Sequence, residues 1–159
     1  DILEDGSLDL PNDVLCLLDL VVGAIHSKFD LPEKKQTERI LRAMDNPYFH
    51  ILAHPTGRLR GTRSPSVMDF ERVVQGAKER GCFLELNAQP DRMDLNDAQC
   101  RYAKEIGVKV AISTDAHSEN DFRNMAFGLS QARRGWLEKN DILNTLSLAQ
   151  LKRLLRRKH

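Results

Sequence analysis

The stretch KVAISTDAH, residues 109–117, is a short apolar run that ends in an aspartate and a histidine. Three earlier apolar runs also end in a polar residue: Val21–Ile25 before His26, Ile51–Ala53 before His54, and Phe83–Leu86 before Asn87. About 30 residues separate each polar residue from the next, which is the length of one strand plus one helix. The spacing predicts βα units whose polar residues meet at the carboxyl ends of parallel strands, where the active sites of barrels lie.

The segments between these runs predict a regular alternation of strands and helices. Strands are expected at 20–26, 49–54, 82–87 and 109–114, and helices at 11–19, 32–44, 68–80, 96–106, 121–133, 139–144 and 148–157. Asn96 is the expected N-cap of its helix, and Gly81 and Gly107 are the expected ends of two helices. A long loop rich in glycine and arginine is expected at 55–65.

The expected fold is an α/β sheet of parallel strands that forms part of a (β/α) barrel. Four strands are too few to close a barrel, which needs about eight. Either the sheet is open or the chain is a fragment. Residues 1–3 favour the fragment, because they look like the last part of a strand whose beginning is missing.

Length and composition fit one soluble domain. The chain has 159 residues, of which 41% are hydrophobic and 30% charged. No apolar stretch approaches the roughly 20 residues of a membrane span, and no signal peptide is visible. Three cysteines are an odd number, so neither a disulfide framework nor a cysteine-based zinc ribbon is supported, and a reducing cytoplasm is favoured. We expect Cys16 and Cys82 to be small core residues.

The formal net charge of +1 does not indicate a polyanionic partner, although basic residues gather near the C-terminus. Such a cluster is more typical of a solvated helix face than of a nucleic-acid contact. The residues concerned are Lys152, Arg153, Arg156, Arg157 and Lys158.

Four residues are candidate metal ligands: His26, His54, Asp115 and His117. Each of them alone has a structural alternative, such as closing a turn. Pro55 should hold His54 extended, and the alternation of side chains along a strand should place Asp115 and His117 on the same side. Their joint occurrence at equivalent strand ends favours a metal site.

Imidazole and carboxylate groups suit zinc, manganese or iron, and such an ion can activate water near neutral pH. We expect His26 and His54 to lie within about 5 Å of each other and to hold one ion between them.

Several arginines surround these candidate ligands. Arg58, Arg60 and Arg63 follow His54, and Arg92 follows Asn87. Because the guanidinium fork matches phosphate oxygens, a phosphoester is a better substrate than an amide or a sugar. A solvated surface loop is the alternative for each arginine alone.

An ordered set of short motifs points to a known family. The motifs are VVGAIHS at 21–27, NPYFHILAHPTGR at 46–58, ELNA at 85–88, PDR at 90–92, STDAHS at 113–118 and ARRGWL at 132–137. Together they resemble the C-terminal part of the polymerase-and-histidinol-phosphatase (PHP) domain of bacterial X-family DNA polymerases.

The resemblance implies a distorted (β/α)₇ barrel with up to three divalent metal ions, used to hydrolyse phosphoesters. In these polymerases it implies a 3′-5′ exonuclease that removes nucleotides from DNA ends in repair. The implied metal ligands are His26, His54, Asp115 and His117, and Glu85 and Asn87 line the site. We expect Asp115 and His117 to be catalytic residues as well, and Arg58 or Arg92 to be the catalytic residue that steadies the phosphate.

The family's opening His-X-His motif, the Asp and His that follow it, and a bridging Glu have no counterpart in this chain. The resemblance therefore implies that residues 1–159 are the C-terminal portion of a single PHP domain, without the N-terminal strands and the polymerase domain. Such a fragment would hold fewer metal ions and act on DNA 3′ ends only within its parent protein. A second copy of the chain, or the missing segment, would cover the strand edge at 20–26.

Two alternative functions remain open from the sequence. One is a phosphomonoesterase of the histidinol-phosphatase kind, which the arginine-rich loop also permits. The other is a non-catalytic module that stabilises or positions a polymerase.

Overall fold

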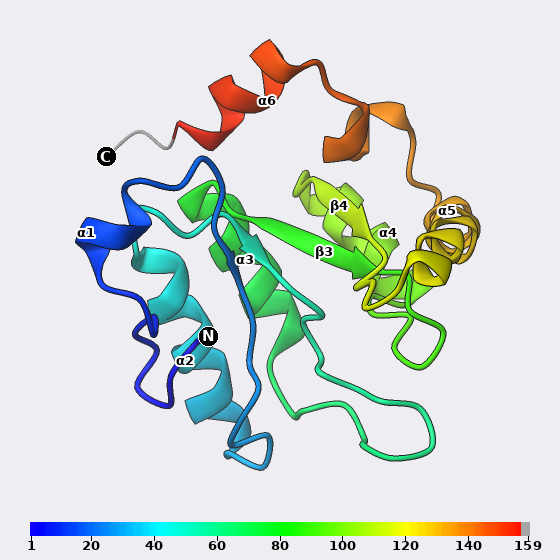
Figure 1. Ribbon diagram of the computed structural model, residues 1–159. Helices are drawn as coiled ribbons and strands as arrows, with labels where there is room; N and C mark the ends of the chain where they lie inside the picture. Colours follow the sequence, from blue (N-terminus) through cyan, green and yellow to red (C-terminus); the bar gives the residue numbers. More distant parts are fainter. Residues whose placement is uncertain (157–159) are drawn as a thin grey trace.

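A computed structural model describes residues 1–156 and contains one four-stranded parallel sheet (Figure 1). The strands are adjacent in the order in which they occur in the chain. They are β1 (Val22–Gly23), β2 (Ile51–Leu52), β3 (Phe83–Asn87) and β4 (Val110–Ser113). The connecting helices are α2 (Glu33–Asp45), α3 (Phe70–Arg80) and α4 (Asp97–Ile106). The predicted α/β alternation is confirmed, and the barrel stays a prediction.

The first two strands are shorter than predicted, because their pairing is irregular. The carbonyl oxygen of Val21 accepts hydrogen bonds from the backbone amides of both His50 and Ile51, at 3.0 and 3.2 Å. Regular pairing is therefore confined to two residues in each strand. Residues 1–3 form no regular strand of their own. Ile2 makes an isolated antiparallel bridge with Leu8, and its amide donates to the Ala24 carbonyl, just after β1, at 2.8 Å.

The predicted helix ends depend on local signals that the structure confirms. Asn96 caps α4 in a capping box with Gln99. Gly81 and Gly107 end α3 and α4 with φ angles of 66° and 81°, the left-handed conformation that glycine adopts without steric cost.

Other predicted helices differ from the structure in length or type. The helix predicted at 11–19 is α1 (Asn12–Leu15), and Cys16, which follows it, is exposed rather than in the core. Cys82 is buried as expected. The segment predicted as 121–133 is a 3₁₀ turn, η1 (Glu119–Asn124), followed by α5 (Met125–Arg134), and 139–144 forms two 3₁₀ turns, η2 (Lys139–Asp141) and η3 (Leu143–Thr145).

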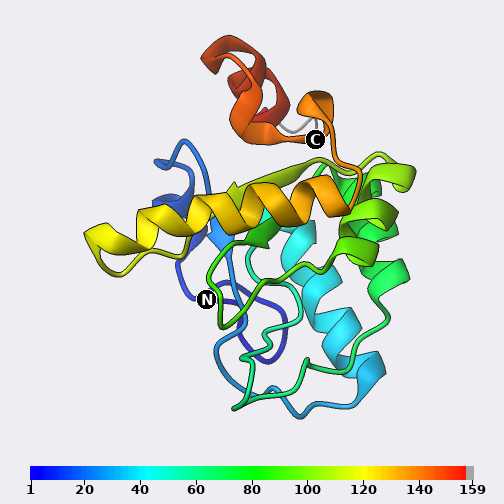
Figure 2. The same ribbon diagram turned by 90° about the vertical axis from the view of Figure 1, so that its right-hand side faces the viewer.

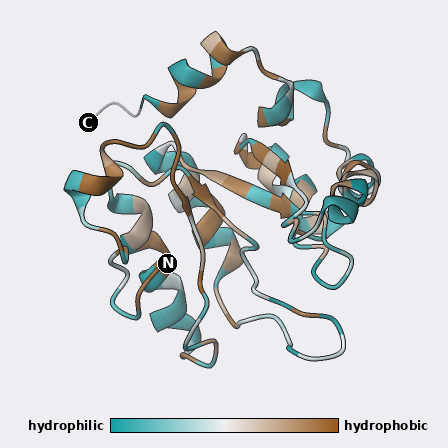
Figure 3. Cartoon of the chain, in the orientation of Figure 1, coloured by the Kyte–Doolittle hydropathy of each residue, from teal (hydrophilic) through white to brown (hydrophobic). Residues whose placement is uncertain are grey.

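Helices α2, α3 and α4 cover one face of the sheet (Figure 1). The hydrophobic core lies between them, and Leu84 and Leu86 of β3 and Val110 of β4 contribute to it. In Figure 3 the strands at the centre of the molecule are mostly hydrophobic, and α2 to one side of them is largely hydrophilic. Because side chains alternate along a strand, Phe83 and Glu85 face the opposite side of the sheet.

Helix α6 (Leu148–Leu155) lies on that opposite side, over the beginnings of the strands (Figures 1 and 2). Ile51 and Phe83, the first residues of β2 and β3, form a second apolar cluster against which leucines of α6 pack. His50 fastens the helix, since its Nδ1 accepts from the Val21 amide at 3.1 Å and its Nε2 donates to the Leu155 carbonyl at 3.0 Å.

Part of the basic C-terminal cluster lies on or just after α6 and hence far from the carboxyl ends of the strands. Lys152 and Arg153 belong to α6, and Arg156 is its C-cap. Arg157 and Lys158 lie outside the described residues. Among residues 1–156, no helix is both long and apolar enough to span a membrane.

Strand β1 forms one edge of the sheet, as the sequence predicts for the segment 20–26. Val22 is 50% exposed there, and Leu20 beside it is 40% exposed. The Ile2 amide covers part of this edge by donating to the Ala24 carbonyl, and the rest, with its apolar side chains, favours association with another strand. What covers this edge stays a prediction.

Candidate functional site

The candidate ligands lie at the carboxyl ends of the strands, as their positions in the sequence predict. The ring centroids of His26 and His54, which follow β1 and β2, are 5.2 Å apart, with the ring planes tilted by 52°. Two imidazoles bound to one tetrahedral ion at the usual zinc–nitrogen distance have centroids about 5 Å apart. The observed separation therefore suits a shared ion, whose presence stays a prediction.

His54 begins a tight turn rather than an extended segment. Its φ angle is 29°, in the left-handed region, which contradicts the extended conformation expected before Pro55. The His54 amide donates to Glu85 Oε2 at 2.5 Å, and the Gly57 amide donates back to the His54 carbonyl at 2.8 Å. These two bonds hold a conformation that the local sequence disfavours.

The His54 imidazole is buried and neutral at ordinary pH. Burial lowers its pKa to about 4, and the positive charge of Arg92 and the neighbouring His26 act in the same direction. The pKa of His26 is also lowered, first by burial and then by Arg92. Both rings thus remain in the unprotonated form that can bind a metal ion.

Asp115 accepts two hydrogen bonds on one oxygen. Its Oδ2 accepts from Asn87 Nδ2 and from Arg92 Nε, each at 3.0 Å. Burial alone would raise the pKa of Asp115, but the Asn87 hydrogen bond and the charge of Arg92 outweigh it and lower the pKa. Asp115 is therefore a carboxylate, and it influences the pKa of both His26 and His54.

His117 is less closely tied to this group than the sequence predicts. Asp115 has a φ angle of 50°, so residues 115–117 are not extended and the expected alternation of side chains does not apply. His117 is exposed, its amide donates to Asp121 Oδ2 at 2.9 Å, and its Nδ1 donates to the Asp115 carbonyl at 2.7 Å.

In His26 and His117, the ring nitrogen Nδ1 makes a hydrogen bond. Nδ1 of His26 bonds to Asp1 Oδ1 at 2.7 Å, and Nδ1 of His117 bonds to a backbone carbonyl. Histidines that bind metals usually make such a bond with their second nitrogen, which fixes the ring. Nε2 is thus the nitrogen that each of these two rings can offer to a metal ion.

Two of the arginines near the site donate hydrogen bonds to backbone carbonyls, and a third contacts the Asp115 carboxylate. Arg58 donates to the carbonyls of Arg92, at 2.6 Å from Nε, and Met93. Arg63 donates to the Gly57 carbonyl at 2.7 Å and lies over the Phe29 ring. Arg92 bonds to Asp115, and its Nη1 is buried without a hydrogen-bond partner among residues 1–156.

Glu85 of β3 is hydrogen-bonded to residues that follow β2, lie in β3 and end β4. Its side chain accepts hydrogen bonds from the His54 amide, the Ser113 hydroxyl and Asn87 Nδ2. Burial raises the pKa of Glu85, although these three donors partly offset the effect. The sequence places Glu85 and Asn87 near the site but gives no sign of these bonds.

The donor chemistry suits a divalent metal ion, but the arrangement is incomplete. Imidazole and carboxylate are the ligands expected for zinc or manganese. Among residues 1–156, however, no three side chains of His, Cys, Asp or Glu converge closely enough to hold an ion. The His26 and His54 rings are close enough to bind one ion as a pair. A full set of ligands would need a rearrangement of the site or further residues.

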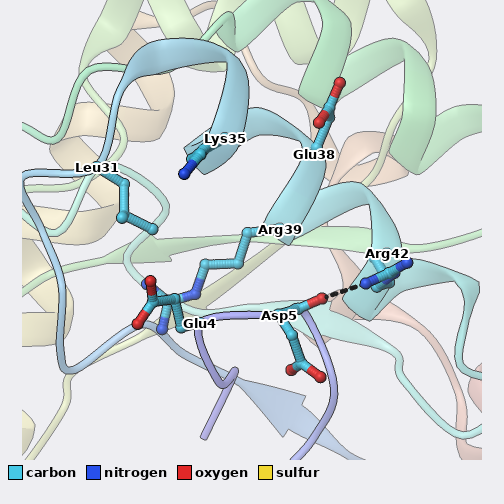
Figure 4. A pocket seen from close by; sticks show the side chains of 7 residues that line it. All are labelled: Glu4, Asp5, Leu31, Lys35, Glu38, Arg39 and Arg42. Atoms are coloured by element: carbon cyan, nitrogen blue, oxygen red, sulfur yellow. Dashed lines mark hydrogen bonds between the residues drawn. The ribbon is translucent and has the colours of Figure 1, made fainter.

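The cavity shown in Figure 4 lies away from these histidines, between the N-terminal loop and α2. Its volume is about 640 Å³, and its lining mixes acids and bases: Glu4, Asp5, Leu31, Lys35, Glu38, Arg39 and Arg42. Arg39 is almost fully buried and donates to the backbone carbonyls of Ile2, Leu3 and Ser27. It fastens the N-terminal segment to α2.

Known proteins are similar in sequence to this chain over nearly its whole length. The DNA polymerase/3'-5' exonuclease PolX of Bacillus subtilis (strain 168) is 41% identical over 157 residues, which are 99% of the chain and 28% of PolX. A probable phosphatase of Thermoanaerobacter sp. (strain X514) is 30% identical over 164 residues, 98% of the chain and 64% of the phosphatase. The chain is homologous to both kinds of protein. No family model matches it.

The chain spans less than two thirds of the length of these relatives. A probable phosphatase of Caldanaerobacter subterraneus subsp. tengcongensis is 32% identical over 123 residues, 72% of the chain and 46% of the phosphatase. The homology is consistent with a portion of a PHP-like domain.

Proposed function

We propose that residues 1–159 form part of a metal-dependent phosphoesterase site that, within a longer protein, removes nucleotides from DNA 3′ ends. The observation that carries the proposal is the meeting of Asp115, Arg92 and the His26–His54 pair at the carboxyl ends of parallel strands. Parallel α/β folds place their active sites at this end. The similarity to a polymerase with 3'-5' exonuclease activity supports the choice of substrate.

His26, His54, Asp115 and His117 are the proposed metal ligands. A divalent ion bound there would supply Lewis-acid catalysis and activate water. His26 and His54 take part as neutral imidazoles, and Asp115 takes part as a carboxylate. These protonation states let the site bind a cation at neutral pH without first losing protons.

Arg92 is the proposed phosphate-binding arginine. Its guanidinium is held at Asp115 through Nε, while its buried Nη1 has no partner among residues 1–156 and can donate to a phosphate oxygen. Arg58 acts indirectly, because its guanidinium fixes the Arg92 and Met93 carbonyls and hence the path of that segment.

A second candidate function is a phosphomonoesterase, which the similarity to probable phosphatases favours. The two functions differ in their products. Full-length protein carrying this chain would be incubated with manganese or zinc and either a 5′-labelled DNA oligonucleotide or p-nitrophenyl phosphate. We expect stepwise shortening of the DNA with release of nucleoside monophosphates, and little phosphate from the monoester.

The Arg92→Lys variant serves as the matched test of the phosphate role, since it keeps the charge but loses the fork. We expect a higher KM for DNA and a smaller change in kcat. Phosphate release from the monoester without DNA shortening would replace the proposal by the monoesterase. Neither activity, in a protein that binds the metal, would favour a non-catalytic module.

A further inference from the structure

The turn at residues 54–57 is held by a second buried carboxylate besides Glu85. Asp94 lies in the loop between β3 and α4 and is fully buried. Its Oδ2 accepts three hydrogen bonds: from the Thr56 amide and the Thr56 hydroxyl, each at 2.9 Å, and from the Gly57 amide at 3.1 Å. One oxygen atom thus satisfies three donors of the turn that begins at His54.

The same aspartate is also fixed to the end of β3. The Asn87 amide donates to the Asp94 carbonyl at 2.5 Å, and the Asp94 amide donates to the Asn87 carbonyl at 3.2 Å. Asn87 in turn donates from its side chain to Asp115. Asp94 therefore joins the His54 turn to the segment that contacts Asp115.

The backbone of His54 needs such support. With a φ angle of 29°, it adopts a left-handed conformation that is unfavourable for a residue with a side chain and persists only where surrounding contacts enforce it. Glu85 holds the first amide of the turn, and Asp94 accepts from the next two amides, of which the Gly57 amide is shared with the His54 carbonyl. Without Asp94, the Thr56 amide and hydroxyl would lose their acceptor. The turn would keep the Glu85 bond, its own internal bond, and the bonds that its carbonyls accept from Arg63 and the Ser66 amide.

We infer that Asp94 is a positioning residue, which holds the His54 imidazole beside the His26 ring and in register with Asp115. That Asp94 fixes the position of the His54 ring does not depend on whether the site binds a metal ion. Its consequence for metal binding rests on the proposed function. Residues that orient metal ligands typically change metal affinity about 10–100-fold when they are removed.

The test compares Asp94→Ala with Asp94→Asn in the metal-free chain. Alanine removes the acceptor of three hydrogen bonds. Asparagine keeps one acceptor oxygen for Thr56 and Gly57 and places its NH₂ group where Asp94 Oδ1 has no partner among residues 1–156. Asp97→Ala is the matched control, because Asp97 is a partly exposed aspartate three residues further along, at the start of α4, where it pairs with Arg134.

The first readout is the nuclear Overhauser effect between the ring protons of His26 and His54. We expect this signal to be lost in Asp94→Ala and retained in Asp94→Asn and Asp97→Ala. The second readout is the Zn²⁺ affinity of the full-length protein by calorimetry, with an expected loss of about 10–100-fold in Asp94→Ala only. An unchanged ring contact in folded Asp94→Ala would overturn the inference.

Two further outcomes are decisive. If the full-length wild-type protein binds no Zn²⁺ but Asp94→Ala still loses the ring contact, the positioning role stands and the proposed metal function fails. If Asp94→Ala does not fold, Thr56→Val, which removes only the hydroxyl donor, replaces it. A weakened ring contact in Thr56→Val would support the inference, and an unchanged contact would contradict it.

Discussion

Charged and polar residues around the site have protonation states set by opposing local effects. His54 has its pKa lowered to about 4 by burial and by Arg92, whereas burial raises the pKa of Glu85. Asp115 has a lowered pKa because the Asn87 hydrogen bond and Arg92 outweigh its burial. The site thus presents neutral imidazoles beside a carboxylate at neutral pH, which is the state that binds divalent cations.

The lowered pKa of His54 predicts a loss of stability in acid. Its folded-state pKa of about 4 lies below the ordinary value of 6.5, so the unfolded chain binds more protons between these pH values. The contribution of His54 is complete above pH 6.5 and is lost as the pH falls through 4. Urea unfolding in EDTA should show a loss of about 2–3 kcal/mol from this group between neutral pH and pH 4.

His54→Gln is the comparison that isolates this effect, since other acids and histidines titrate in the same range. The variant should lose less stability than the wild type over this pH range. Equal pH dependence of the two proteins would show that His54 is not held neutral by the fold.

For individual residues, the sequence predicts position better than contacts. His26, His54 and Asp115 lie at strand ends, and their spacing in the sequence is sufficient to place them together. The bonds made by Asp94 could not be predicted, because this residue lies in a loop without periodic pattern and reads as an ordinary turn residue. The left-handed backbone of His54 depends on distant carboxylates, which no local rule before a proline includes.

For helices and strands, the sequence predicts the features that depend on local signals and does not predict those that depend on tertiary contacts. Caps such as Asn96 and Gly107 act within a few residues, so the ends of α4 follow from the sequence. The short β1 and β2 do not, because their length depends on how the chain pairs around Val21. An apolar run shows that a segment is buried but not how many of its residues join the ladder.

The packing of α5 on β4 predicts a sensitive glycine (Figure 2). A Cβ atom at Gly128 would lie 2.6 Å from Ile112 Cγ2 and 2.8 Å from Ala88 Cβ. Gly128→Ala should therefore lower the free energy of unfolding by about 1–3 kcal/mol, the usual cost of overpacking. Ser130→Ala, at an exposed position of the same helix, is the control in urea unfolding. Equal stability of Gly128→Ala and the wild type would contradict the close approach.

For the chain as a whole, the two ends of the sheet have different roles. The carboxyl ends of the strands carry the histidines, Asp115 and Arg92, while α6 packs over the amino ends. The α/β class and the parallel strand order follow from the alternation of elements, which leaves few other topologies. The place of α6 could not be predicted, because an amphipathic helix shows that it packs but not on which surface.

The function of the chain is best tested by DNA 3′-end hydrolysis in the full-length protein, comparing the wild type with Asp115→Ala. Asp115 is the carboxylate that contacts both Asn87 and Arg92, and its negative charge influences the pKa of both His26 and His54. We predict a loss of hydrolysis of about 100-fold or more, typical of removing a group that stabilises the transition state, with nucleotide addition nearly unchanged. Exonuclease activity retained at the wild-type rate in Asp115→Ala would contradict the proposed site.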